Sequence, residues 1–119
     1  MRDAALEIVH RDRLMVAPIA GGDPSPLEEG EASQRNGAFS PNGRWLAYAS
    51  DESGRNEVYV RPFPGPGGKW QISTDGSEFP TWSRNGKELF YRTADQRIWV
   101  ATYSADNASF RADKPSPVV

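Results

Sequence analysis

The sequence of 119 residues predicts an all-β protein, on three observations. It contains 10 prolines and 11 glycines, a content typical of chains in which short strands alternate with turns. Apolar residues occupy consecutive positions in runs such as residues 45–48 and 89–91, as they do in strands covered on both faces. A long segment of the sequence also occurs twice. We therefore expect short strands in sheets that have neighbours on both sides.

The repeat has a period typical of a β-propeller blade. Residues 39–48 return as residues 82–91, 43 positions later, and blades repeat every ~40–45 residues. Residues 57–63 match residues 97–103 at a shift of 40, because the second copy has a shorter loop. Residues 13–19 are a further partial copy of the same segment. The sequence thus predicts a partial β-propeller of about two and a half four-stranded antiparallel blades.

Each blade can be divided into strands. We expect a partial N-terminal blade and linker at residues 1–33, a full blade at 34–73 and a second full blade at 74–119. The strands expected in the partial blade are 6–9 and 14–19, without a first strand. Those in the full blades are 34–40, 45–49, 57–63, 69–73, 78–83, 88–93, 97–103 and 116–119.

Tight turns connect the first and second strands of both full blades. In the first turn Pro41 presets φ, and a glycine accepts the left-handed conformation that closes a hairpin. We therefore predict positive φ at Gly43 and Gly86. The residues to which we assign this structural turn role are Ser40, Pro41, Asn42, Gly43, Ser83, Asn85 and Gly86.

At these turns the sequence resembles the TolB-like or WD-repeat-like propellers, whose blades carry proline, any residue, aromatic, serine, proline, Asp or Asn, and glycine. The second full blade matches at Pro80, Trp82, Ser83, Asn85 and Gly86, and the first at residues 39–43. The departures are Gly37 and Arg84, which stand where prolines are usual, and asparagine in both turns. Residues 39–64 also look like the C-terminal propellers of bacterial serine/threonine kinases, which implies a sensor or scaffold role for the parent protein.

No pattern in the sequence predicts catalysis. His10 is the only histidine and falls in a short turn, so we expect a solvated residue rather than a base. A G-x-S-x-G nucleophile elbow and a glycine-rich phosphate loop do not occur. Because the sequence contains no cysteine, it offers no thiolate ligand. We expect no enzyme activity, no catalytic residue and no cofactor.

Two acidic groups and a Pro-Gly segment have ordinary structural interpretations. The spacing of Asp51, Glu52 and Glu57 fits no calcium loop, so we expect no metal there. The segment 62–68 is expected to be a rigid turn between strands rather than a ligand for a partner domain. The remaining acidic run, expected to be a solvated connection, is Glu28, Glu29 and Glu31.

The four tryptophans divide into two pairs. Trp82 and Trp99 occupy matched blade positions and are expected in the core between blades. Trp45 has Glu88 as its counterpart in the other copy, which favours exposure of Trp45 or Trp70. We name Trp45 and Trp70 as candidates for contact with a partner.

The charge pattern excludes some partners. With 14 basic and 16 acidic residues the net charge is -2, which is not typical of a nucleic-acid-binding protein. No apolar run approaches the ~18 residues of a membrane span, and the compartment is left open. The function we expect is a noncatalytic propeller segment that binds protein partners or copies of itself. The alternatives are a fragment of the substrate-gating or sensor propeller of a larger enzyme, of kinase or prolyl-oligopeptidase type, and a glycan-binding or small-molecule-binding propeller.

Overall fold

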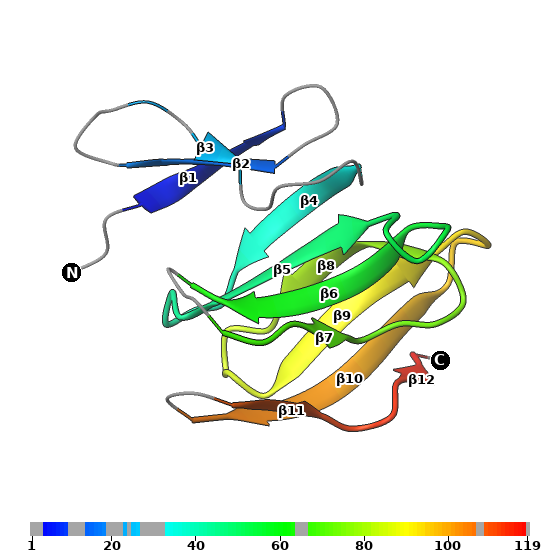
Figure 1. Cartoon of the computed structure of the whole chain (residues 1–119). Coiled ribbons are helices and arrows are strands. Elements are labelled where there is room, and N and C mark those ends of the chain that lie inside the picture. The colour runs from blue at the N-terminus through cyan, green and yellow to red at the C-terminus, as the bar shows by residue number, and fades with distance from the viewer. Residues whose placement is uncertain are drawn as a thin grey trace.

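A computed structural model describes residues 4–9, 14–18, 23, 25–26, 33–63, 67–106 and 109–118. Three antiparallel sheets stack in chain order (Figure 1). The N-terminal sheet contains β1 (Ala4–Val9), β2 (Leu14–Pro18) and β3 (Ser25–Pro26). The middle sheet contains β4 (Gln34–Phe39), β5 (Trp45–Ser50), β6 (Glu57–Pro62) and β7 (Trp70–Gln71). The C-terminal sheet contains β8 (Ser77–Trp82), β9 (Glu88–Thr93), β10 (Ile98–Ala105), β11 (Phe110–Ala112) and β12 (Ser116–Pro117).

Every expected strand is present, although β7 and β12 are shorter than predicted, and two strands, β3 and β11, were not expected. β11 pairs with the end of β10 at Tyr103–Ala105, and β12 pairs with β10 at Trp99 and Val100. The outer position of the C-terminal sheet is therefore shared by two short strands. The two residues of β3 and the three residues of β11 were missed because such short segments have no readable periodicity.

The first strands of the two larger sheets, β4 and β8, share an irregularity. The pairing register shifts between Arg35 and Ala38 in β4 and between Glu78 and Thr81 in β8. Inside these bulges Asn36 and Phe79 both have φ of 59°. Asparagine tolerates this left-handed conformation, whereas it is uncommon for a bulky residue. The backbone of the bulge is thus kept in both copies although the residue type differs.

The first predicted turn is closed by a serine and an asparagine. The Ser40 hydroxyl donates to Asn42 Oδ1 at 2.8 Å and accepts the Trp45 N–H at 3.1 Å. The N–H of Gly43 donates to the Ser40 carbonyl at 2.8 Å, and the φ of Gly43 is 72°. The prediction of positive φ is confirmed here.

The second turn repeats these contacts. The Ser83 hydroxyl donates to Asn85 Oδ1 at 2.6 Å and accepts the Glu88 N–H at 3.0 Å. Gly86 has φ of 75°, as predicted. The turn therefore does not need the proline, which Arg84 replaces, because the hydrogen bonds of the side chains close it.

A large core lies between the middle and C-terminal sheets. Its buried residues are Trp45, Ala47, Val58, Val60, Ile72, Trp82, Leu89, Tyr91, Ala101 and Phe110. The indole N–H of Trp82, in the C-terminal sheet, donates to the carbonyl of Ala38, in the middle sheet, at 2.8 Å. This hydrogen bond joins the C-terminal sheet directly to β4 of the middle sheet.

A second, smaller core covers the opposite face of the middle sheet. Its buried residues are Leu14, Leu46, Tyr48, Tyr59 and Phe63. Leu14 belongs to β2, so the N-terminal sheet contributes to this core. The middle sheet is consequently buried on both faces, in the manner expected of an internal blade.

The prediction that Trp45 is a contact residue is wrong, because its side chain is only 2% exposed. Phe110 of the unexpected strand β11 packs on it, with ring centroids 5.3 Å apart. Trp70 is half-buried and packs edge-on against Trp45, with centroids 5.7 Å apart. Trp82 is buried and Trp99 partly buried, in agreement with the expected core positions.

Candidate functional site

The C-terminal sheet has one face that no other described residue covers. We call it the open face and define its apolar part by Phe79, Phe90, Ile98, Val100 and Val118. Ile98 is 43% exposed and belongs to β10, whose alternate residues Trp99 and Ala101 belong to the large core. Val118 follows β12, is 47% exposed and donates its N–H to the Ile98 carbonyl, so it lies beside Ile98. Polar residues that surround this apolar part are Glu78, Glu88, Arg92 and Thr102.

The repeat shows what normally covers such a face. Val58 and Val60 of the middle sheet correspond to Ile98 and Val100 of the open face. Both valines are 0% exposed, because the C-terminal sheet packs on them. The open face is therefore the surface on which a further sheet would pack if the stack continued.

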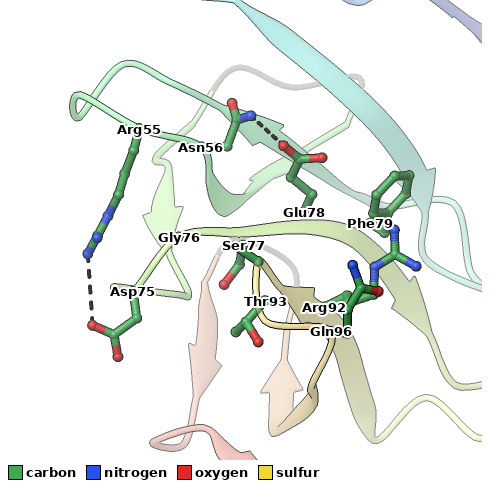
Figure 2. Close-up of a pocket in the computed structure, with 11 residues that line it drawn as sticks. Arg55, Asn56, Asp75, Gly76, Ser77, Glu78, Phe79, Arg92, Thr93 and Gln96 are labelled. Atoms are coloured by element: carbon green, nitrogen blue, oxygen red, sulfur yellow. Dashed lines mark hydrogen bonds and ion pairs between the residues drawn. The ribbon is translucent and has the colours of Figure 1, made fainter.

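A pocket of about 410 Å³ lies where β8 begins, and we call it the rim pocket (Figure 2). Residues of both larger sheets line it: Arg55, Asn56, Asp75, Gly76, Ser77, Glu78, Phe79, Arg92, Thr93, Ala94 and Gln96. The Asn56 amide donates to Glu78 Oε2 at 2.5 Å, and the Arg92 guanidinium lies 4.4 Å from the centre of the Phe79 ring. The pocket is thus a mixed surface of two arginines, two carboxylates and an exposed aromatic ring.

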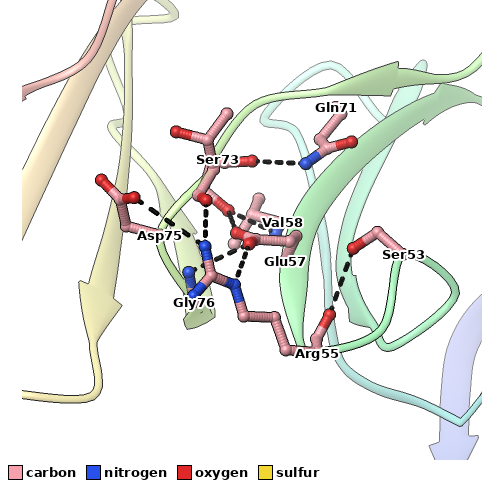
Figure 3. Close-up of polar contacts among 9 residues, drawn as sticks. Ser53, Arg55, Glu57, Val58, Gln71, Ser73, Asp75 and Gly76 are labelled. Atoms are coloured by element: carbon pink, nitrogen blue, oxygen red, sulfur yellow. Dashed lines mark hydrogen bonds and ion pairs between the residues drawn. The ribbon is translucent and has the colours of Figure 1, made fainter.

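A buried carboxylate fixes the wall of this pocket (Figure 3). Glu57 is 2% exposed and accepts hydrogen bonds from the Ser73 hydroxyl at 2.5 Å, Arg55 Nε at 3.0 Å and the Gly76 N–H at 3.0 Å. The Arg55 guanidinium also donates to the Thr74 carbonyl. A buried charge is tolerated when it is paired and its oxygens are hydrogen-bonded, so Glu57 ties the loop before β6 to the loop before β8.

The acidic residues singled out from the sequence do not converge. Asp51 accepts the Ser33 N–H at 2.7 Å, and Glu52 pairs with Lys69 at 2.7 Å, while Glu57 is buried as described above. Among the described residues no group of three His, Cys, Asp or Glu side chains is placed to hold a metal. The described part of the chain likewise has no helix long and apolar enough to cross a membrane.

Several sequence predictions fall outside the described residues. These positions are His10, Glu28, Glu29, Glu31 and residues 64–66 of the Pro-Gly segment. Sequence reasoning also missed Phe79 and Arg92, which form the most exposed aromatic contact of the rim pocket. An alignment of the two copies could have indicated the role of Phe79. It places this bulky residue opposite Asn36, and asparagine is a residue that tolerates the left-handed conformation of a bulge.

Comparison with known proteins gives the fold. The sequence matches no protein-family model, and no curated protein matches it either. The solved structure of a protein assigned as TolB from Agrobacterium tumefaciens is similar, with a TM-score of 0.63 and 21% sequence identity. The match covers 84% of this chain and 40% of that chain, so this chain spans about two fifths of the length of that protein. With its antiparallel sheets of about four strands, the chain is all-β and matches part of a TolB β-propeller.

Proposed function

We propose that this chain is a noncatalytic propeller segment that assembles with a second copy of itself through the open face. The observation that carries the proposal is the equivalence of this face with the fully buried face of the middle sheet, where Val58 and Val60 are 0% exposed. Exposed contiguous apolar surface of this kind marks an interaction site in soluble proteins.

The partner is inferred from the repeat. Val58 and Val60 share the large core with residues of the C-terminal sheet, which is a sheet of the same repeat. These residues include Trp82, Leu89 and Tyr91. A partner for the open face should therefore be another blade, and a second copy of the chain supplies one.

The number of sheets suggests how two copies would combine. The N-terminal sheet and the open face lie at opposite ends of the stack (Figure 1). Contact between the open face of one copy and the N-terminal sheet of another is head-to-tail, and such contacts generate closed rings when the rotation allows. Two copies of three sheets provide six, within the ~4–8 blades usual for a propeller.

The noncatalytic part of the proposal is supported by the chemistry of the rim pocket. Its hydroxyl groups belong to Ser77, whose hydroxyl has no hydrogen-bond partner among the described residues, and to Thr93, which donates to the exposed carboxylate of Asp95. The hydrogen bond from Thr93 lowers the pKa of Asp95, so this carboxylate is a poor base for removing the proton.

The test is light scattering coupled to size-exclusion chromatography of the full chain over a range of concentrations. We expect a discrete dimer that dissociates on dilution, and we expect Val100→Asp to weaken it at least ~10-fold because a charge must be desolvated in the contact. Ser53→Asp adds the same charge to an exposed loop of the middle sheet and should leave the dimer intact. A monomer at every concentration, or equal weakening by both substitutions, would rule out this assembly.

A further inference from the structure

A cavity of about 340 Å³ lies between the middle and C-terminal sheets, and we call it the inter-sheet cavity. It shares Asp75, Ser77 and Thr93 with the rim pocket, but its remaining walls are different. Those walls are formed by Ile72, Thr74, Tyr91, Trp99, Lys114 and Pro115.

Two polar groups of this cavity have no hydrogen-bond partner among the described residues. They are the hydroxyl of Ser77, a residue only 3% exposed, and the indole N–H of Trp99, whose nitrogen is buried. In Figure 2 the Ser77 hydroxyl lies on the side of β8 where Asp75 and Thr93 are found, opposite Glu78 and Phe79. Most buried polar groups in proteins are hydrogen-bonded, so two unpartnered groups in one cavity call for an explanation.

The two groups without a partner can both act as donors. An indole N–H can only donate, and a serine hydroxyl can donate or accept. Burial raises the pKa of Tyr91 to about 12, with a further contribution from the charges of Glu57 and Asp75, so its phenol keeps its proton at neutral pH. An occupant of this cavity must therefore present an acceptor oxygen.

The charged and apolar residues of the cavity wall further restrict the chemical class of an occupant. The carboxylates of Glu57 and Asp75 that act on Tyr91 disfavour an anion near the phenol, and the ammonium group of Lys114 in the cavity wall disfavours a cation. The Asp75 side chain is largely exposed and lies 3.8 Å from the guanidinium of Arg55. The side chain of Ile72, the ring of Trp99 and Pro115 offer apolar contact to the rest of an occupant.

We propose that the inter-sheet cavity is a binding site for an uncharged amide carbonyl next to an apolar side chain. The carbonyl oxygen accepts from the Trp99 indole N–H and the Ser77 hydroxyl, and the side chain contacts Ile72 and Pro115. Such a group can come from a peptide segment or from a small amide, since both present the same acceptor.

The experiment is a titration of the ¹⁵N-labelled full chain, followed at the indole N–H resonances of its four tryptophans. The probes are N-acetyl-leucinamide, which is neutral, N-acetyl-leucine, which is an anion, and leucinamide, which is a cation. We expect the neutral probe to shift the Trp99 resonance saturably and to bind at least ~10-fold more tightly than either charged probe. The Trp82 resonance is an internal control, because its N–H already donates to the Ala38 carbonyl at 2.8 Å.

Two substitutions and one matched control test the contacts. Trp99→Phe identifies the resonance and removes the donor, and Ser77→Ala removes the hydroxyl, so each should weaken binding by roughly 5- to 20-fold. Ser104→Ala removes a hydroxyl from an exposed position of β10 outside the cavity and should change nothing. If Trp99→Phe does not fold, Ser77→Ala still tests the proposal.

A blocked tripeptide with leucine between two glycines distinguishes the two sources. Binding of both this peptide and N-acetyl-leucinamide indicates that a chain segment can enter, whereas binding of N-acetyl-leucinamide alone indicates a site for small amides. The absence of a saturable Trp99 shift with every probe, or equal affinity for neutral and charged probes, would overturn the proposal.

Discussion

The middle and C-terminal sheets are copies of one repeat, yet they differ in what covers them. All six residues of β5 in the middle sheet are buried. In β9, the equivalent strand of the C-terminal sheet, fully buried residues alternate with partly exposed ones. The strand conformation is the same, so the difference arises from the neighbours. The burial of a blade therefore depends on its place in the stack. The same substitution can be made at equivalent positions of the two sheets, one covered and one open, and its effects compared.

The largest expected effect comes from placing the same charge in both copies. Val60→Asp buries a carboxylate without a partner in the large core, at a cost of several kcal/mol against a total stability of ~5–15 kcal/mol. Val100→Asp places the carboxylate at the equivalent position of the open face, where it stays hydrated. We expect Val60→Asp to be unfolded and Val100→Asp to melt within about 5 °C of the parent protein.

Circular dichroism melting curves at low protein concentration check this difference, because dilution separates folding from association. If both variants unfold to the same extent, the open face is not open in solution and the comparison fails.

A second effect should appear only at alkaline pH. The pKa of Tyr91 is raised from 10.0 to about 12, so the folded state holds this proton more tightly than the unfolded state. The resulting stabilisation is complete below pH 10 and is lost as the pH rises through the folded value near 12.

Urea unfolding of the parent protein and Tyr91→Phe at pH 8 and pH 11 tests this sign. The free energy of unfolding should fall more steeply with pH in the parent protein than in the variant, whereas Tyr103, whose pKa is also raised, contributes equally to both. Parallel pH profiles would contradict the assignment to Tyr91.

The two turn serines should differ because of their burial. Ser40→Ala leaves the Trp45 N–H without its serine acceptor in a buried place and should cost about 1–3 kcal/mol. Ser83→Ala breaks the equivalent bond to Glu88 at a more exposed place, where water substitutes, and should cost about 0.5 kcal/mol. Chemical denaturation measures both values. Equal costs would show that the burial of the first turn does not strengthen the effect of losing its hydrogen bond.

The smallest expected change in stability comes from the bulges of β4 and β8. Phe79→Asn copies the residue of the other bulge and relieves a left-handed φ that costs a bulky residue about 1–2 kcal/mol. It also removes the contact with Arg92, worth about 0.5–1 kcal/mol at an exposed site. We expect the free energy of unfolding to rise by up to about 1 kcal/mol.

Phe79→Ala is the matched control, since it loses the ring and keeps the unfavourable φ. A lower stability for Phe79→Asn than for Phe79→Ala in the same denaturation experiment would show that the bulge is not strained.

The sequence predicted the parts of the fold that repeat. The turn glycines, the long strands and their order follow from local rules that act within a few residues, such as the left-handed φ at Gly43 and Gly86. The burial of Trp45 could not be predicted, because it depends on Phe110, which lies 65 residues away in a strand of three residues. The resemblance to kinase propellers stays a prediction.

The candidate sites were less accessible to sequence reasoning than the fold. Ser77, Trp99 and Tyr91 are ordinary residues of a blade, and only the packing of two sheets brings them around one cavity. The unpartnered state of the Trp99 indole N–H is a feature of three-dimensional packing for which the sequence has no signal. By contrast the open face could have been read from the repeat, by aligning Ile98 and Val100 with Val58 and Val60.

The short strands at one edge of each sheet limit how further chains can associate with the protein. β3, β7 and β12 contain two residues each, and β3 and β12 each contain a proline. Short edges with proline are poor templates for adding a further strand, since proline has no N–H to donate. The opposite edges are β1, β4 and β8, which contain six residues each, but a bulge or register shift interrupts the pairing of each one and also disfavours a further strand. Neighbours can therefore be added through sheet faces far more readily than through sheet edges. Concentrated solutions should then give particles of defined size rather than fibrils, because stacking through faces ends once the ring is closed.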